Sequence, residues 1–277
     1  MRWLIVIVLT GNLLTVSVKG HSQERNVSSI LERFFYRISN SRDDAERLKL
    51  NDSVLSVIDS YSRSDSVLSH RFNSIRNLGQ IASPDRKVKI ITWNLNKSDG
   101  TSNYYCYFIR NEGRGEQNRV DKLICKNSPE TIGTDKTYSG SDWYGALYYD
   151  IRPFKIGKQT YYILLGIDYH NLLLTRKIIE VLTFTRDGQI IFGKNCFTDG
   201  SKGRYRVVLE YSSAGVVSLR FVSDKLIVFD HLVPFSAENK NNREFYGAEY
   251  SNDAYIFKNG IWKFVQDYKT GNKKKVP

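Results

Sequence analysis

An aspartate and a histidine stand next to each other in the segment KLIVFDHLVPF, residues 225–235. A carboxylate beside an imidazole is a pairing that general acid–base catalysis uses often. Asp230 and His231, however, close an apolar run with the alternation of a β-strand, and side chains on a strand point to alternate faces. We expect Asp230 at the end of the apolar face, accepting backbone N–H groups from a turn, and His231 on the opposite face. The pattern favours a structural role over a catalytic one.

A second candidate pair lies in the segment LLGIDYHN, residues 164–171. Asp168 and His170 stand where a predicted strand ends, a place where an aspartate commonly organises a turn. If both turns lie at the same end of a sheet, the four side chains would line a common pocket, which makes Asp168, His170, Asp230 and His231 the candidate pocket residues. No catalytic residue is predicted.

Other patterns of catalysis and metal binding are absent from the sequence. Its four histidines show no HExxH spacing, and no serine stands in a G-x-S-x-G elbow. Three cysteines without CxxC spacing make a zinc or redox site improbable. We therefore predict no metal and no cofactor. The paired carboxylates of a glycoside hydrolase are neither predicted nor excluded, because the distance between them is a property of the fold.

The cysteines instead indicate a hairpin in YYCYFIRNEGRGEQNRVDKLICK, residues 104–126. Centring its turn between Gly115 and Glu116 places two charge pairs, one apolar pair and one thiol pair on a single face: Glu112 with Arg119, Arg110 with Asp121, Phe108 with Leu123, and Cys106 with Cys125. Two cysteines directly opposite on paired strands come within disulfide reach. We predict a Cys106–Cys125 disulfide, with two reduced buried cysteines as the alternative. Cys196 is expected in the core.

The pattern divides the chain into a helical and a strand-rich part. Residues 21–82 carry apolar stripes at helical spacing, with a break at SNSRDD and a third stripe at Leu68, Phe72 and Ile75. Residues 83–268 hold about a dozen strand-like runs separated by turns. We predict an α+β protein, with short N-terminal helices followed by a large antiparallel β-meander curled into a barrel-like or sandwich arrangement.

Two tight turns predict strand register. A turn centred on Asn259-Gly260 places Phe257 opposite Trp262 and Tyr255 opposite Phe264. A turn centred on Ser223-Asp224 would place three pairs opposite each other: Phe221 with Leu226, Leu219 with Val228, and Val217 with Asp230.

The N-terminus has the pattern of a secretory signal peptide. Arg2 precedes an apolar stretch, and Val18 and Gly20 are the small residues that a signal peptidase requires, so cleavage is expected before His21. An uncleaved anchor is the alternative, although Thr10, Gly11 and Asn12 interrupt the apolar run. No later stretch would cross a membrane as a helix. We predict export, to the periplasm or outside the cell.

The chain is basic, with a formal net charge of +12. Losing Arg2 and Lys19 from its 41 basic residues leaves 39 against 29 acidic ones, a net charge of +10. The charge is dispersed apart from a predicted solvated tail at residues 269–277, and no concentrated basic and aromatic surface indicates nucleic-acid binding. A glycan or an anionic component of the cell envelope is the partner class that these features allow.

Several segments together resemble an uncharacterised family of exported proteins from Bacteroidota-type bacteria. They are SPDRKVKIITWN (83–94), YYILLGID (161–168), RKIIEVLTFTRDGQIIFG (176–193), IVFDHL (227–232) and YSNDAYIFKNGIWKFVQD (250–267). The family favours Trp-Asp-Gly after LLG, where this chain has Ile167, Asp168 and Tyr169. The resemblance implies export and an antiparallel sheet. No activity is attached to the family.

The leading hypothesis for function is a non-enzymatic, exported binding module of the envelope or the secreted fraction. One alternative is a hydrolase that acts on an extracellular polymer with Asp168 or Asp230 as general acid or base. Another is association with an anionic surface, such as lipopolysaccharide or a glycan, through the basic charge.

Overall fold

The computed structural model describes residues 12–64, 66–72, 75–113 and 117–269. The chain divides into two compact units between Asn77 and Leu78. Three predictions fall partly outside the described residues: the first eleven residues of the signal peptide, the tip of the hairpin at residues 114–116, and residues 270–277 of the tail. Signal-peptide cleavage before His21 stays a prediction.

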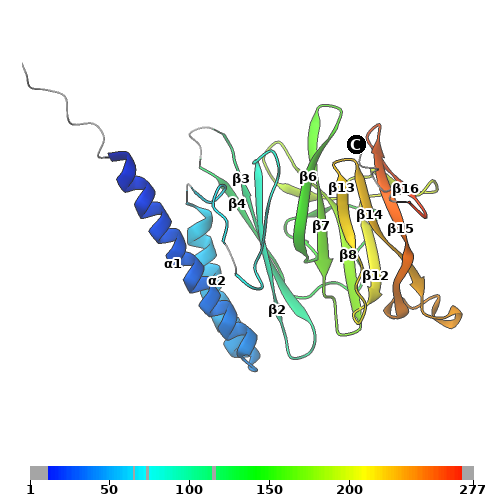
Figure 1. Cartoon of the computed structure of the whole chain (residues 1–277), viewed down its shortest axis with the longest axis horizontal. Coiled ribbons are helices and arrows are strands. Elements are labelled where there is room, and N and C mark those ends of the chain that lie inside the picture. Colours follow the sequence, from blue (N-terminus) through cyan, green and yellow to red (C-terminus); the bar gives the residue numbers. More distant parts are fainter. Residues whose placement is uncertain (1–11, 65, 73–74, 114–116, 270–277) are drawn as a thin grey trace, which may run out of the picture. The chain divides into compact units, whose positions relative to one another are not determined.

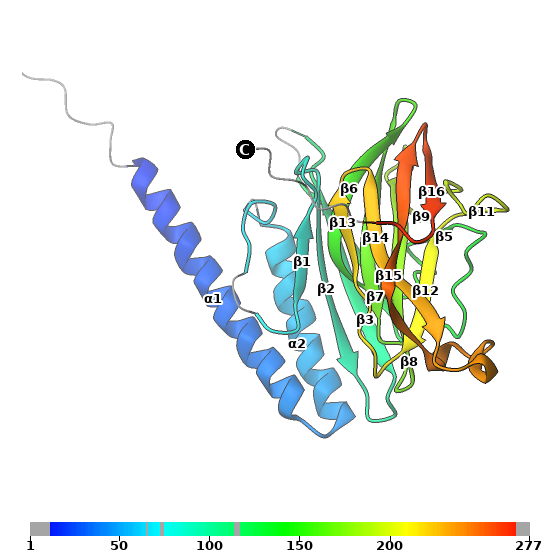
Figure 2. The ribbon, with the colours of Figure 1, turned by 45° about the vertical axis from the view of Figure 1, so that its right-hand side comes forward.

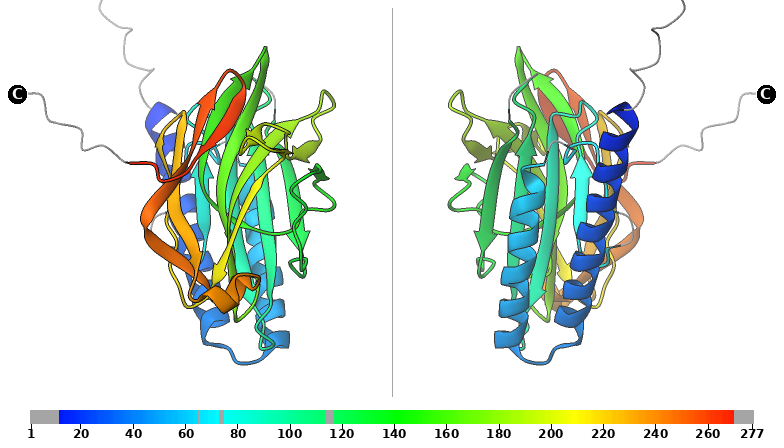
Figure 3. Two further views of the ribbon diagram at one scale, coloured as in Figure 1. Left: turned by 90° about the vertical axis from the view of Figure 1, so that its right-hand side faces the viewer. Right: turned by 90° about the vertical axis from the view of Figure 1, so that its left-hand side faces the viewer.

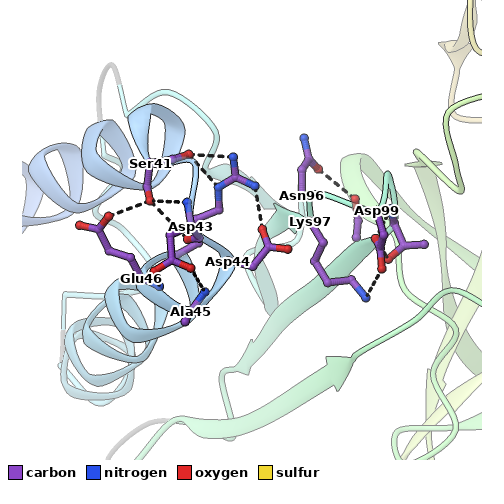
Figure 4. A network of polar contacts seen from close by, with 11 residues as sticks. Ser41, Asp43, Asp44, Ala45, Glu46, Asn96, Lys97 and Asp99 are labelled. Carbon is purple, nitrogen blue, oxygen red and sulfur yellow. Dashed lines mark hydrogen bonds and ion pairs between the residues drawn. The ribbon is translucent and has the colours of Figure 1, made fainter.

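The first unit contains two helices joined by a tight connection. Helix α1 spans Asn12–Asn40 and α2 spans Asp44–Ser62, and they run side by side in opposite directions (Figure 3). The predicted break at SNSRDD is confirmed. Asp43 caps α2, because its carboxylate accepts the N–H groups of Ala45 and Glu46 at 3.0 and 3.3 Å (Figure 4). None of the described helices is long and apolar enough to span a bilayer.

The predicted third helix does not form. The described residues between α2 and the first strand make turns, with one helical-type bond from the N–H of His70 to the carbonyl of Ser66. The side chains of Ser64 and Ser69 bond to nearby backbone carbonyls and so compete with helix formation. The ring of Phe72 instead packs on Tyr61 near the end of α2, with centroids 4.4 Å apart. Strand β1 begins at Gly79, four residues before the predicted boundary.

The second unit consists of three sheets (Figure 1). The first sheet has the order β1-β2-β3-β4, from strands Gly79–Ala82, Val88–Asn96, Ser102–Arg110 and Arg119–Cys125. The middle sheet has the order β5-β9-β8-β7-β6, from Tyr138–Ser139, Ile190–Phe192, Leu174–Phe184, Gln159–Asp168 and Leu147–Ile156, and β12, Val207–Ser212, pairs with β8. The third sheet has the order β11-β10-β16-β15-β14-β13, from Gly203–Arg204, Phe197–Thr198, Ile261–Val265, Tyr246–Lys258, Leu226–Pro234 and Leu219–Ser223. Between β14 and β15 lie two short 3₁₀ helices, η1 at Ala237–Asn239 and η2 at Arg243–Phe245.

Most strands pair antiparallel with a neighbour in the chain, which confirms the predicted meander. One contact is different in kind: β10 pairs with β16 in parallel, with Phe197 opposite Trp262. The sheets form a sandwich-like arrangement, not a closed barrel (Figure 2). The predicted α+β class is therefore confirmed, and of its two alternatives the sandwich is the one found.

The middle sheet is buried on both faces. Leu164 of β7 and Ile178 of β8 point into a core shared with the first sheet, whereas Ile163 and Ile179 point into a core shared with the third. A strand with two buried faces needs apolar residues at consecutive positions. This explains the apolar run of β7 and the largely apolar run of β8, which the buried Arg176 and Glu180 interrupt.

The register of the last hairpin is as predicted, and the Ser223-Asp224 hairpin is not. Phe257 faces Trp262 and Tyr255 faces Phe264. Between β13 and β14 a bulge after Phe221 shifts the pairing, so that Leu219 faces Phe229 and not Val228. Because Phe229 points into the core, Asp230 points away from it, and its expected place on the apolar face is wrong.

The predicted disulfide is absent, because the β3–β4 register differs by two residues from the expected one. Cys106 faces Leu123 and Cys125 faces Tyr104, and all three cysteines are free thiols. Diagonal neighbours on paired strands lie roughly 7 Å apart, beyond ordinary disulfide reach. A two-residue slip preserves the face, so Arg110 still reaches Asp121, with Nη2 and Oδ2 2.9 Å apart.

These free thiols are testable. We expect a thiol reagent to titrate three thiols in the protein unfolded without reductant. In the folded protein all three should react slowly, because burial raises the pKa of Cys125 to about 11 and that of Cys196 to about 12, and raises the pKa of Cys106 as well. A single titratable thiol in the unfolded protein would instead show that Cys106 and Cys125 form a disulfide.

Candidate functional site

A pocket opens between β12 and the strands β14 to β16 of the third sheet. Its volume of about 340 Å³ lies in the range of small-molecule sites. Aromatic side chains from three adjacent strands form one wall: Phe229, Tyr255 and Phe264. Tyr255 lies between the other two, with ring centroids 5.9 Å from Phe229 and 5.6 Å from Phe264. Val207 and Leu209 of β12 line the opposite wall.

A histidine and an aspartate lie at the edge of this aromatic wall. Nδ1 of His231 is 2.8 Å from Oδ2 of Asp253. The register of β14 against β15 shifts between Asp230 and Leu232, so His231 has no direct cross-strand partner and turns toward Asp253. Oδ1 of Asp253 accepts the backbone N–H of Asp267 at 3.1 Å, which holds the carboxylate in place. The His231 side chain keeps 24% of its surface exposed.

The remaining charges around the pocket are mostly paired. Arg204 donates to Asp199 at 2.7 Å, and Glu210 accepts from Nε of Arg176 at 2.9 Å. Hydrogen bonds from Ser201, together with Arg204, lower the pKa of Asp199 to about 2, so it is ionised at neutral pH. Arg243 lies over the ring of Tyr246, 4.2 Å from its centroid.

Asp168 and His170, predicted for a common pocket, lie in a different environment. Asp168 is fully buried, and its Oδ2 accepts a hydrogen bond from Oγ of Ser128 at 2.7 Å and lies 3.3 Å from Nη1 of Arg176. His170 is also buried. Its Nε2 is 3.5 Å from the Glu130 carboxylate, near enough for an ion pair if the ring is protonated but without the alignment of a hydrogen bond.

Asp230 is fixed by a hydrogen bond from the residue that precedes β13. Its Oδ2 accepts the backbone N–H of Ser218 at 2.8 Å, a bond of the kind expected for a carboxylate beside a turn. Its neighbour His231 bonds to Asp253 on β15, so the two adjacent side chains do not pair with each other. Of the four predicted pocket residues only His231 lines this pocket.

Asp253 is the important residue that sequence reasoning missed. A signal was present: alternation along β15 places Asp253 on the same face as Tyr255 and Phe257, the aromatic face predicted from the Asn-Gly turn. A carboxylate at such a position needs a partner, and a histidine on the neighbouring strand is a suitable one. The other charged lining residues come from loops and short strands that carried no such signal.

Two buried ion pairs involve residues of β8: Arg176 with Asp168, and Glu180 with Arg206. Both arginines also donate to backbone carbonyls of the connection between β4 and β5. Arg176 donates to the backbone carbonyls of Pro129 and Glu130, in addition to its two carboxylate partners. Four residues along β8, Glu180 accepts from Nε of Arg206 at 2.7 Å and from the hydroxyl of Tyr144 at 2.6 Å. Burial raises the pKa of Glu180, and Arg206 opposes that rise.

Arg206 also bonds to the connection between β4 and β5. It donates to the carbonyls of Gly133 and Lys136, and its guanidinium lies over the ring of Tyr138 with 4.6 Å to the centroid. Both arginines are fully buried. Both bond to carboxylates and backbone carbonyls of the protein itself, which indicates that they stabilise the fold.

Within the described part of the chain, no group of three or more histidine, cysteine, aspartate or glutamate side chains could hold a metal ion. Comparisons with protein-family models, with curated proteins and with solved structures find no match to this chain.

We expect the Glu180–Arg206 pair to be essential for stability. Arg206→Met leaves the buried Glu180 carboxylate without its cationic partner and three backbone carbonyls without this donor, so the free energy of unfolding should fall by about 3–5 kcal/mol. Urea unfolding followed by tryptophan fluorescence measures the loss. Adding Glu180→Gln to this variant should recover part of it, because the uncompensated charge is then removed.

Arg204→Met is the matched control, since Arg204 also pairs with an aspartate but keeps 43% of its side-chain surface exposed. It should cost no more than about 1 kcal/mol. Equal losses for the two arginine variants would contradict the structural role of the buried pair.

Proposed function

We propose that this chain is an exported, non-enzymatic binding module and that the pocket between β12 and β14–β16 takes a saccharide. The observation that carries the proposal is the composition of the pocket: an aromatic wall with fixed, mostly paired polar groups at its edge. Sugar rings present apolar C–H faces that pack on aromatic rings, and hydroxyl groups that both donate and accept hydrogen bonds. Such a ligand matches this wall and edge.

The charges of the pocket support an uncharged ligand. The lining carries three carboxylates, Asp199, Glu210 and Asp253, and two arginines, Arg204 and Arg243. Asp199 pairs with Arg204, and Glu210 shares the buried Arg176 with Asp168, so the lining has no excess of positive charge. A strongly anionic polymer would find no cluster of unpaired cations here.

The proposal of a binding module and not a hydrolase rests on the surroundings of the carboxylates. Asp168 is buried against Arg176, and Asp230 accepts a backbone N–H. Neither lines the pocket. The two residues on which the hydrolase hypothesis depends are therefore not placed to reach a substrate bound in this pocket. Export is inferred from the N-terminal pattern of Arg2, the apolar stretch, Val18 and Gly20.

The test is a panel of neutral disaccharides, composed of cellobiose, maltose, lactose and diacetylchitobiose, titrated by calorimetry. We expect at least one to bind the wild-type protein. Phe264→Leu should weaken that binding about 2- to 10-fold, the equivalent of the ~0.5–1.5 kcal/mol of an aromatic contact. Phe221→Leu is the matched control, because Phe221 packs against the same core but does not line the pocket.

Two results would count against the proposal. One is the absence of binding by every saccharide of the panel. The other is the release of monosaccharides during prolonged incubation, if the release is lost in Asp168→Asn or Asp230→Asn, since that would favour the hydrolase.

A further inference from the structure

The contact between His231 and Asp253 determines which nitrogen of the imidazole carries the proton. An ionised carboxylate only accepts hydrogen bonds. Oδ2 of Asp253 lies 2.8 Å from Nδ1 of His231, so the proton of the neutral ring must sit on Nδ1. Nε2 then carries the lone pair and acts as an acceptor. It has no hydrogen-bond partner among the described residues, and the ring lines the pocket.

The surroundings hold Asp253 and the ring in place. The carboxylate is nearly buried, and its second oxygen accepts the N–H of Asp267. The charged groups that line the pocket around the imidazole are Asp199 and Arg204 near β10 and β11, Glu210 of β12 and Arg243 of η2. Tyr255 also lines the pocket, and burial raises the pKa of its phenol to about 12, so it stays neutral.

We propose that His231 determines the specificity of the pocket, because its Nε2 accepts a hydrogen bond from a hydroxyl or amide N–H of the bound saccharide. Asp253 is the positioning residue that holds the imidazole in this tautomer. The inference rests on the proposed saccharide function and extends it: the ligand must present a hydrogen-bond donor at the edge of the aromatic wall. A methylated or deoxygenated sugar at that position lacks the donor.

The first experiment needs no ligand. ¹⁵N NMR of the histidine side chains distinguishes a protonated from an unprotonated ring nitrogen. We expect His231, assigned by its loss in His231→Gln, to be the Nδ1–H tautomer at pH 7.5. In Asp253→Asn the amide can donate to Nδ1, and the population should shift toward the Nε2–H tautomer. An Nε2–H tautomer in the wild-type protein would overturn the proposal.

The second experiment measures affinity for the tightest-binding disaccharide of the panel at pH 7.5. Asp253→Asn should bind at least 5-fold more weakly than wild type, because the imidazole of His231 then no longer presents Nε2 as the acceptor.

His170→Gln is the control, because it removes a buried imidazole outside the pocket and should keep the wild-type affinity. An Asp253→Asn variant that binds as tightly as the wild-type protein would refute the role of His231. Failure of every disaccharide to bind would instead refute the saccharide function, while the NMR result would still decide the tautomer.

Discussion

The second unit depends on two fully buried arginines. Arg176 and Arg206 each neutralise a carboxylate that the middle sheet requires, and each uses its remaining N–H groups on backbone carbonyls of the connection between β4 and β5. A guanidinium has five donors in a rigid plane, and a buried one is tolerated only when those donors find acceptors. The connection has little regular structure of its own, so these bonds supply the pairing that a sheet would otherwise provide.

The same pairs also position a wall of the pocket. Arg206 directly precedes β12 and Glu210 lies within it, and both point toward the buried carboxylate and guanidinium of β8. Side chains alternate along β12, so Val207 and Leu209 face the opposite way, toward Phe229 and the third sheet. The buried ion pairs of β8 thus help to fix the position of β12, the strand that forms one wall of the pocket.

The sequence predicted those features that short stretches of chain determine. Asn259-Gly260 needs positive φ at both positions and has it, so the last hairpin has the predicted register. The β3–β4 hairpin has a longer loop, and there the charge pattern was compatible with two registers that share a face. His231 was found because it closes an apolar, strand-like run, whereas its partner Asp253 lies on the neighbouring strand and meets it beside a register shift between Asp230 and Leu232. The pocket itself joins segments far apart in the chain, and no local pattern specifies that.

The parallel pairing of β10 with β16 has a consequence for how the molecule is made. Thr198 and Lys263 are neighbours in space although more than sixty residues separate them, and Trp262 packs fully buried beside Phe197. Contacts of such long range form late and slowly. The third sheet can be completed only after β16, its last strand in the chain, has been synthesised.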